Sequence, residues 1–247
     1  TVATINLDHV MKLRHDPMFR RIYNDMDLIT PDGMPFVWLS RQEGTPLPGR
    51  ITGSDLLFEL ARSAAETGQK LFLFGSTHER LHGAAKALKT EFPRLRFAGA
   101  YAPPFGFERD AAIHEEVTQI LRTVRPDIIL VALGAPRQEI FSAAMAERVR
   151  HGVFIGVGGG LDFLSGVRRA PGFMQRAGLE WLWRAVTEPV RLGPRFLNII
   201  LHLPVLFRAH KRDRAEHEAA VEREAALADG AAQELPAAAG EDAPPRG

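Results

Sequence analysis

The sequence predicts an α/β fold with a mostly parallel β-sheet covered by helices on both faces. Three short runs, 70–75, 127–132 and 152–157, are almost entirely apolar and lead directly into glycine-containing turns. Strands that are buried on both faces of a parallel sheet have this composition. Segments with helical spacing of their apolar residues separate the runs, and such alternation is typical of α/β proteins.

Two shorter strands are expected at the start of the chain, over 2–6 and 27–30. Residues 7–23 between them have helical spacing, with an interruption at Pro17. The second strand leads into Pro31-Asp32-Gly33 and then a helix over 35–41. This turn presents one carboxylate at the end of a strand, where a general base can act, although Asp-Gly is also a common pair in ordinary turns.

The remaining elements follow from their caps and spacing. A loop over 44–49 precedes a helix that runs to Thr67, with Ser54 as its expected N-cap. Ser76-Thr77 is expected to cap a helix to residue 91, and Pro136 to occupy the first position of a helix to residue 149. A strand over 95–98 and a helix over 110–124 complete the pattern.

Ligands of such sheets bind beyond the carboxyl ends of the strands. Glycine lets the backbone approach a ligand closely, and helix N-termini attract anions, so a nucleotide diphosphate is the expected ligand. The residues that lie at these strand ends and are expected to bind it are Gly75, Ser76, Gly134, Pro136, Gln138, Glu139 and Gly158.

Several other site types lack their motifs. The run from Gly156 begins like the dinucleotide fingerprint but has Leu161 at the third glycine position, and no phosphate-binding loop with Gly-Lys-Ser/Thr is present. The chain contains no cysteine, so thiolate zinc sites and cysteine nucleophiles are excluded. Asp25-Met26-Asp27 resembles a metal-binding D-x-D motif but precedes a strand, and we interpret it as a solvated turn. No metal site is expected.

Charge is distributed unevenly along the 247 residues. Residues 213–247 contain nine acidic and three basic side chains, net −6, so the total of +1 leaves +7 on residues 1–212. A basic body suits an anionic partner, either phosphate, a membrane surface or nucleic acid. No nucleic-acid recognition motif supports the last. No apolar run reaches the length of a membrane span, and no secretory leader is recognised.

Three regions are expected: a catalytic domain over 1–188, a basic and apolar helical appendage over 189–212, and an acidic, Ala-rich, disordered tail over 213–247. Arginines precede and follow the apolar residues of the appendage. This arrangement fits the interfacial zone of an anionic bilayer, although a core helix docked on the domain has a similar pattern.

A series of short motifs resembles the WecG/TagA/CpsF family of bacterial glycosyltransferases (glycosyltransferase family 26). The resemblance covers about residues 2–200. In order, the motifs are Thr4-x-Asn6, Pro31-Asp32-Gly33, Arg50-x-Thr52-Gly53-x-Asp55-Leu56, Leu73-x-Gly75, Gly134-x-Pro136-x-Gln138-Glu139, Gly156-Val157-Gly158, Asp162, Gly166, Arg169-Ala170-Pro171, Gly178-Leu179-Glu180-Trp181-x-x-Arg184 and Glu188-Pro189-x-Arg191.

The resemblance implies a Rossmann-like α/β domain with a helical C-terminal appendage that completes the site and touches the membrane. It also implies an inverting, metal-independent transfer without a cofactor, from a UDP-sugar to a saccharide on a polyprenyl diphosphate. The sugar is of the ManNAc, ManNAc-uronate or glucose type, and the products are cell-wall polymers, capsule or exopolysaccharide. The enzyme is then cytoplasmic and peripheral on the inner face of the cytoplasmic membrane, possibly as a homo-oligomer.

Site roles follow from the same resemblance. Asp32 matches the base, and Thr4 and Asn6 line its pocket. Gln138 is expected to hydrogen-bond the ligand, and Glu139 either to do the same or to brace the loop. Arg184, Arg191 and, less securely because Pro194 precedes it, Arg195 are expected to face the diphosphates. The other substrate-binding residues expected are Arg50, Gly53, Asp55, Asp162 and Arg169.

Alternatives stay open at this point. Arg50 and Asp55 can simply pair and brace a loop, and Asp162 can cap a helix. The chain can be a non-catalytic, membrane-associated partner of a polysaccharide assembly complex, although the presence of Asp32, Thr4 and Asn6 argues against it. A nicotinamide-dependent oxidoreductase is disfavoured by Leu161.

Overall fold

The computed structural model describes residues 1–164, 170–172, 174, 180–190 and scattered positions between 193 and 223. It does not describe the side chains of residues 162, 163, 180, 181 and 184. Contacts between residues divide the chain into two units, Thr1–Phe196 and Leu197–Gly247, which we describe separately.

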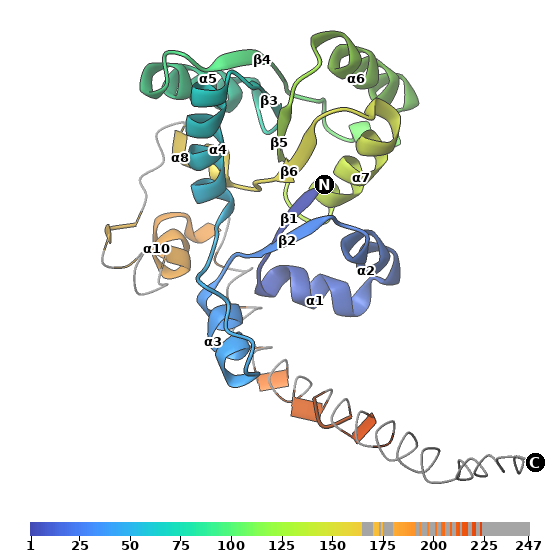
Figure 1. Cartoon of the computed structure of the whole chain (residues 1–247), viewed down its shortest axis with the longest axis vertical. Helices are drawn as coiled ribbons and strands as arrows, with labels where there is room; N and C mark the ends of the chain where they lie inside the picture. The colour runs from blue at the N-terminus through green and yellow to red at the C-terminus, as the bar shows by residue number, and fades with distance from the viewer. Residues whose placement is uncertain are drawn as a thin grey trace, which may run out of the picture. The chain divides into compact units, whose positions relative to one another are not determined.

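A six-stranded sheet forms the centre of the first unit (Figure 1). Its order is β2-β1-β6-β5-β3-β4, and all neighbouring strands are parallel. The predicted α/β fold with a parallel sheet is therefore confirmed. The strands are β1 (Val2–Ile5), β2 (Leu28–Pro31), β3 (Lys70–Gly75), β4 (Arg96–Tyr101), β5 (Ile128–Ala132) and β6 (Val153–Gly156).

Helices connect the strands and lie on both sides of the sheet, as parallel pairing requires (Figure 1). They are α1 (Leu7–His15), α2 (Pro17–Asn24), α3 (Met34–Gln42), α4 (Gly53–Thr67), α5 (His78–Glu91), the short 3₁₀ helix η1 (Phe107–Arg109), α6 (Ala111–Val124), α7 (Arg137–Val149), α8 (Gly160–Leu164) and α10 (Glu180–Thr187).

The core has two layers because side chains alternate along each strand. Leu71 and Leu73 of β3 lie in one layer, which also contains apolar residues of α4, α5 and α8. Phe72 and Phe74 lie in the other layer, with residues of α6 and α7. A smaller cluster packs Ala3 of β1 against α2. Both faces of the central strands are thus covered, which explains why their sequences are continuously apolar.

Local predictions mostly hold, with three corrections. Pro136 is the N-cap of α7 and not its first residue, since the helix begins at Arg137. Pro17 does separate two helices, since α1 ends at His15 and α2 begins at Pro17. Ser54 is not the cap of α4: Thr52 is the N-cap, and its hydroxyl accepts a hydrogen bond from the Asp55 backbone N–H at 3.1 Å. The strand expected over 95–98 is longer and ends at Tyr101, because it continues to pair with β3.

The second unit is helical at every position that the structure describes between 197 and 223. Leu197, Leu201 and Val205 are exposed and spaced by four residues, so they lie on one face of this helical segment. Arg208, Lys211 and Arg212 follow and are also exposed. Among the described residues, no helix is both long and apolar enough to cross a bilayer.

Candidate active site

The turn after β2 holds Asp32 beside the end of β1. The Asp32 backbone N–H donates to the Ile5 carbonyl at 2.7 Å, which extends the β1–β2 pairing by one residue. A later part of the chain lies on the other side of this turn, where the Ile51 N–H donates to the Pro31 carbonyl at 2.8 Å. Asp32 is partly exposed. Its carboxyl group is thus carried by a turn that is fixed at both sides.

Thr4 and Asn6 come from the end of β1, next to Asp32. Asn6 is the N-cap of α1, and its side-chain oxygen accepts hydrogen bonds from the backbone N–H groups of Asp8 and His9 at 3.1 and 3.2 Å. The cap uses only the oxygen of this amide, so the Asn6 nitrogen, a donor, takes no part in it. Thr4 is buried, and its hydroxyl donates to the Gly156 carbonyl over a long 3.4 Å.

Gln138 and Glu139, at the start of α7, are each only 2% exposed. The Gln138 side-chain oxygen accepts from the Gly158 N–H at 3.0 Å, and its nitrogen donates to Glu139 Oε1 at 2.8 Å. A backbone donor on one side and a carboxylate on the other determine which way the amide points. The bond to Glu139 uses one of the two Nε2 protons of Gln138, and the burial of Glu139 favours its bracing role.

Two further residues of this region, His9 and Tyr23, were missed by sequence reasoning. His9 is 3% exposed; its Nδ1 accepts from the Asn6 N–H at 3.1 Å, and its Nε2 lies 3.5 Å from Glu139 Oε1. Tyr23 is also buried, with its ring 5.9 Å from that of His9. Burial raises the pKa of the Tyr23 hydroxyl, and the Glu139 and Asp32 charges raise it further.

The signal for His9 was present in the sequence but weak. An Asn followed three residues later by a side chain that can accept a hydrogen bond is the pattern of a capping box, and Asn6 and His9 form one here. Nothing local indicates that the other ring nitrogen approaches α7. Tyr23 carries no local signal at all, since it occupies an ordinary apolar position of α2.

Buried polar atoms without partners gather in this region. The structure gives no hydrogen-bond partner to His9 Nε2, Tyr23 Oη, Thr30 Oγ1 or Glu139 Oε2 among the residues that it describes. Each such atom costs about 1–3 kcal/mol, so a cluster of them indicates a function. We call the region the β2–β1–β6 corner, defined by Thr4, Asn6, His9, Tyr23, Thr30, Asp32, Gln138, Glu139 and Gly158.

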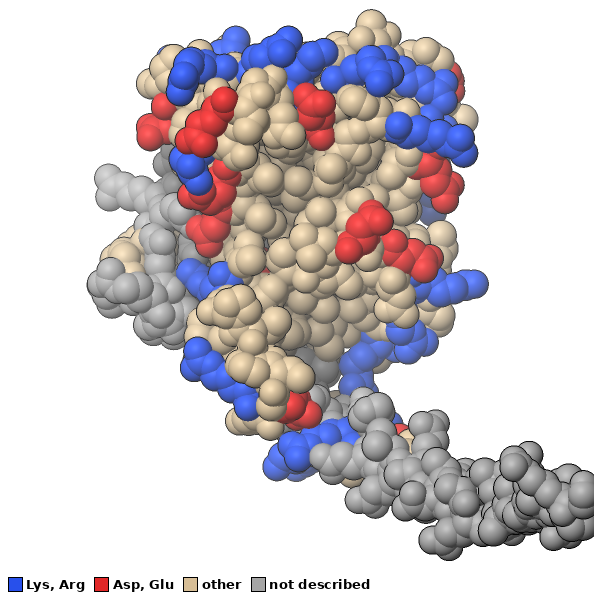
Figure 2. All heavy atoms as spheres, in the orientation of Figure 1, with Lys and Arg blue, Asp and Glu red and all other residues tan. Residues whose placement is uncertain are grey.

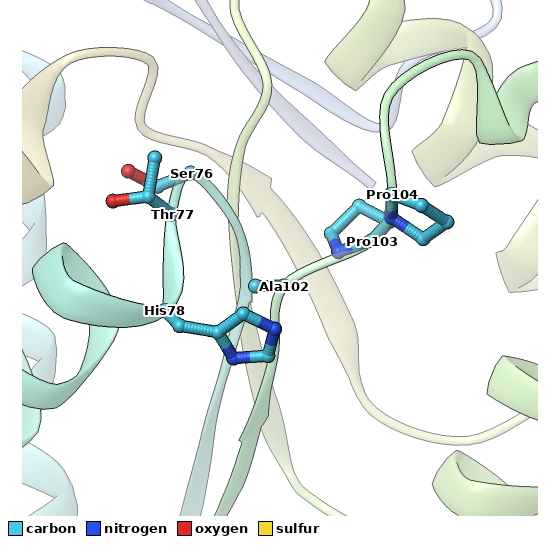
Figure 3. A pocket seen from close by; sticks show the side chains of 6 residues that line it. All are labelled: Ser76, Thr77, His78, Ala102, Pro103 and Pro104. Atoms are coloured by element: carbon cyan, nitrogen blue, oxygen red, sulfur yellow. The ribbon is translucent and has the colours of Figure 1, made fainter.

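Other predicted residues lie at a second place on the same edge, the β3–β4 corner. Here an open cavity of about 350 Å3 lies beyond the ends of β3 and β4. Figure 3 shows Ser76 and Thr77 on one side of it and the two prolines on the other. The lining residues, which with Gly75 define this corner, are Ser76, Thr77, His78, Ala102, Pro103 and Pro104.

The two corners are centred on different strands of the same edge. In the sheet order, β2 and β3 are four strand-to-strand steps apart, roughly 19 Å at about 4.8 Å per step, whereas β6 and β3 are two steps apart, roughly 10 Å. The structure therefore groups Asp32, Thr4, Asn6, Gln138, Glu139 and Gly158 around β2, β1 and β6, and Gly75 and Ser76 lie two strands away from β6. Gly134 and Pro136 lie between these groups, after β5 and before α7.

Structural requirements explain two further predicted residues. A Cβ on Gly53 would lie 2.6 Å from the Val157 carbonyl, so this glycine lets α4 pack against the end of β6. Asp55 accepts a hydrogen bond from the Thr52 hydroxyl at 2.7 Å, within the N-terminal turn of α4. Arg50 is partly buried just before this turn.

Five predicted residues cannot be placed in the site. Arg169, Arg191 and Arg195 lie outside the described residues. Asp162 lies on α8 and Arg184 on α10, but their side chains are outside the description. Their expected roles stay predictions.

Positive charge is abundant at the opposite edge of the sheet. Figure 2 shows Lys and Arg side chains gathered over α5 and α6, at the top of the view. Arg96 begins β4, whereas Arg125 and Arg150 shortly precede β5 and β6, and all three are exposed. Much of the basic character of the first unit thus lies at the amino ends of the strands, away from both corners.

No group of three or more metal-binding side chains occurs among the residues that the structure describes. Asp25 and Asp27, the acidic pair that resembles a metal motif, are both exposed. Asp27 accepts a hydrogen bond from the Thr1 hydroxyl at 2.9 Å.

Comparison with known proteins identifies the family. The model of the glycosyl transferase WecG/TagA/CpsF family matches residues 1–216. A protein of Bacillus spizizenii is 32% identical over 216 residues, which is 87% of this chain and 81% of the relative. Relatives from Bacillus subtilis and Staphylococcus aureus are 31% and 30% identical, over 86% and 85% of this chain and 81% of each relative.

All three relatives are named N-acetylglucosaminyldiphosphoundecaprenol N-acetyl-beta-D-mannosaminyltransferase. The match extends through both corners and α10. It confirms the family that the ordered motifs indicated. The chain belongs to the glycosyl transferase WecG/TagA/CpsF family.

Proposed function

We propose that this glycosyltransferase moves a hexose, of the N-acetylmannosamine type, from a UDP-sugar to a saccharide carried on a polyprenyl diphosphate. The names of the relatives support the sugar and the acceptor. The observation that carries the proposal is the position of Asp32, whose turn is tied to the end of β1 at the carboxyl edge of the sheet.

Asp32 is the proposed general base. Its carboxylate takes the proton of the acceptor hydroxyl while that oxygen attacks the anomeric carbon of the donor. The new C–O bond forms on the face opposite the leaving group, the bond from the anomeric carbon to the diphosphate breaks, and UDP leaves with the electron pair. One displacement of this kind inverts the anomeric configuration.

The neighbours of Asp32 have supporting roles in this proposal. The Asn6 amide and the second Nε2 proton of Gln138 are donors that can hold sugar hydroxyl or diphosphate oxygens. Arg184 and Arg191 are proposed to neutralise the departing diphosphate, and no metal ion is required. Arg195 is a further candidate for the same role.

The lipid-linked acceptor places the reaction at a membrane surface. In the second unit, the exposed Leu197, Leu201 and Val205 precede the exposed cations Arg208 and Lys211. An apolar face next to basic residues binds the interface of an anionic bilayer. We propose peripheral binding to the inner face of the cytoplasmic membrane.

A donor screen tests the proposal directly. The full chain is incubated with N-acetylglucosaminyl-diphosphoundecaprenol in anionic vesicles and, separately, with UDP-linked ManNAc, ManNAc-uronate and glucose, with and without EDTA. We expect transfer from UDP-ManNAc that EDTA does not abolish. Transfer that requires a divalent ion would contradict the metal-independent mechanism.

The same screen addresses the alternative of a non-catalytic assembly partner. That alternative predicts vesicle binding without transfer or hydrolysis of any UDP-sugar. A chain that sediments with the vesicles and turns over none of the donors would overturn the proposed function.

A further inference from the structure

A line of polar contacts crosses the β2–β1–β6 corner from α1 to the loop after β6. It starts at the Asn6 N–H, which donates to His9 Nδ1 at 3.1 Å. His9 Nε2 lies 3.5 Å from Glu139 Oε1, which accepts from Gln138 Nε2 at 2.8 Å. The Gly158 N–H completes the line by donating to Gln138 Oε1 at 3.0 Å.

The contact at Asn6 determines the tautomer of His9. Because Nδ1 accepts a hydrogen bond from a backbone donor, the ring proton must lie on Nε2. That N–H is on the nitrogen nearest Glu139, at a distance that is long for a firm hydrogen bond. The side chains of His9 and Glu139 are only 4% and 1% exposed, so even this contact is little screened by water.

Glu139 depends on this contact because few groups stabilise its carboxylate. Gln138 donates to one oxygen, and no hydrogen-bond partner of the other is found among the residues described. A buried carboxylate held by one amide is costly, and a polar N–H beside it lowers that cost. Without the His9 N–H, the Glu139 carboxylate is less stabilised in its present position and its side chain would rotate. The Gln138 amide, which donates to it, would rotate as well.

We infer that His9 is a positioning residue, which acts through Glu139 to orient the Gln138 amide and hold the backbone at Gly158. The four groups come from α1, α7 and the loop after β6, so the line ties together the elements that surround the corner. The effect of His9 on catalysis rests on the proposed function, whereas its effect on the backbone at Gly158 does not.

A simpler role for His9 is to close the capping box of α1, and two substitutions separate the roles. His9→Asn places an acceptor near the position of Nδ1 and so keeps the bond from Asn6, but it removes the group that faces Glu139. His9→Gln places an amide near the position of Nε2 and gives up the cap. The inferred role predicts loss of function in His9→Asn and its retention in His9→Gln. A capping role predicts the reverse, with retention in His9→Asn and loss in His9→Gln.

The first measurement is amide hydrogen exchange of Gly158, followed by NMR on the folded full chain. We expect faster exchange in His9→Asn and near-normal exchange in His9→Gln, because only the former releases Glu139 and Gln138. His114→Asn is the matched control: it alters another histidine with a buried, unpartnered Nε2, which packs against Phe107 and Phe141 in a different core layer. Unchanged Gly158 exchange in His9→Asn would overturn the inference.

The second measurement is transfer of the sugar to the lipid acceptor. We expect kcat/KM to fall about 10- to 100-fold in His9→Asn, as for other residues that orient a functional side chain, and to stay close to wild type in His9→Gln. A larger loss in His9→Gln than in His9→Asn would assign His9 to the cap, and equal losses in both variants would also contradict the inference. If the wild-type chain transfers no sugar, the proposed function fails, and the exchange data still decide the positioning role.

Discussion

The β2–β1–β6 corner and the β3–β4 corner lie on the same edge of one sheet, and they differ in what they bury. In both, glycine lies at or just after the end of a strand, and one strand is followed by a helix with a side-chain cap. Around β3 and β4 the buried neighbours are aromatic, with Phe74 stacked on Tyr101 and Phe141. Around β1 and β2 they are polar, and four polar atoms have no hydrogen-bond partner among the described residues, whereas His114 Nε2 is such an atom beside the aromatic group.

This difference separates two structural features that can indicate a functional site. Glycines and helix N-termini at strand ends occur at both corners, so they identify the edge and not the site. Buried polar atoms without partners reduce stability, and a folded protein keeps them where they serve a purpose. We therefore expect substitutions in the β2–β1–β6 corner to alter activity and substitutions in the β3–β4 corner to alter stability.

The largest effect is expected for Asp32→Asn. The amide cannot take a proton from the acceptor, so kcat should fall by about 100- to 10,000-fold, the usual contribution of a general base. Transfer assays with saturating donor measure this. Asp25→Asn is the matched control, since Asp25 is exposed at the end of α2. If Asp32→Asn kept the wild-type kcat, Asp32 would not be the general base.

A pair of glycine substitutions tests the division between the corners. In Gly156→Ala the new Cβ lies 2.8 Å from Gln138 Nε2, a side chain that can move, so kcat/KM should fall about 10-fold or more while stability falls by about 1–3 kcal/mol. In Gly75→Ala the Cβ lies 2.6 Å from the Ala132 carbonyl, and the backbone has a φ of +99° that alanine disfavours. Its free energy of unfolding should fall by about 3 kcal/mol or more.

Urea denaturation and transfer kinetics on both variants measure these effects. Gly49→Ala serves as control, because a Cβ there meets no atom within 4 Å. If Gly156→Ala kept the wild-type kcat/KM, the position of the Gln138 amide would be irrelevant to transfer. If Gly75→Ala were as stable as Gly49→Ala, the packing described at the end of β3 would be wrong.

The smallest effect at neutral pH is expected for Tyr23→Phe, which removes a buried hydroxyl without a described partner. In the unfolded chain the phenol ionises near a pKa of about 10, whereas burial and nearby carboxylates raise the pKa of Tyr23 in the folded protein. Unfolding then releases a proton above pH 10, so the stability of the wild type falls as pH rises.

Tyr23→Phe should lose this part of the pH dependence, and its stability relative to wild type should rise by up to about 1.4 kcal/mol per pH unit above pH 10. Denaturation midpoints between pH 7 and pH 11 measure it. Tyr101→Phe is the comparison at the end of β4, next to the β3–β4 corner, where the hydroxyl is accessible and donates to Glu116 at 3.1 Å. A larger effect for Tyr101→Phe than for Tyr23→Phe would reverse our assignment of the buried phenol.

Local chemistry explains the predictions that succeeded. Apolar runs, proline breaks and turn residues act over a few positions, so the strands, the break at Pro17 and the turn carrying Asp32 could be recognised one by one. The cap of α4 was assigned wrongly because Thr52 and Ser54 are both good capping residues two positions apart. Only the backbone geometry decides which hydroxyl reaches the free N–H.

The sequence by itself determined the fold class, most of the elements and the family, because each depends on short patterns or on their order. It also predicted the role of Asp32, which stays a prediction. The tertiary structure decided which of the predicted residues share a site. Pairing β1 with β6 brings Asn6 and Gln138 to one corner and leaves Ser76 four strands from β2. It also places His9, which looks like an ordinary helical residue in the sequence, beside Glu139, 130 positions further along the chain. Strand order is set by the burial of both sheet faces across the whole domain, and no local pattern encodes it.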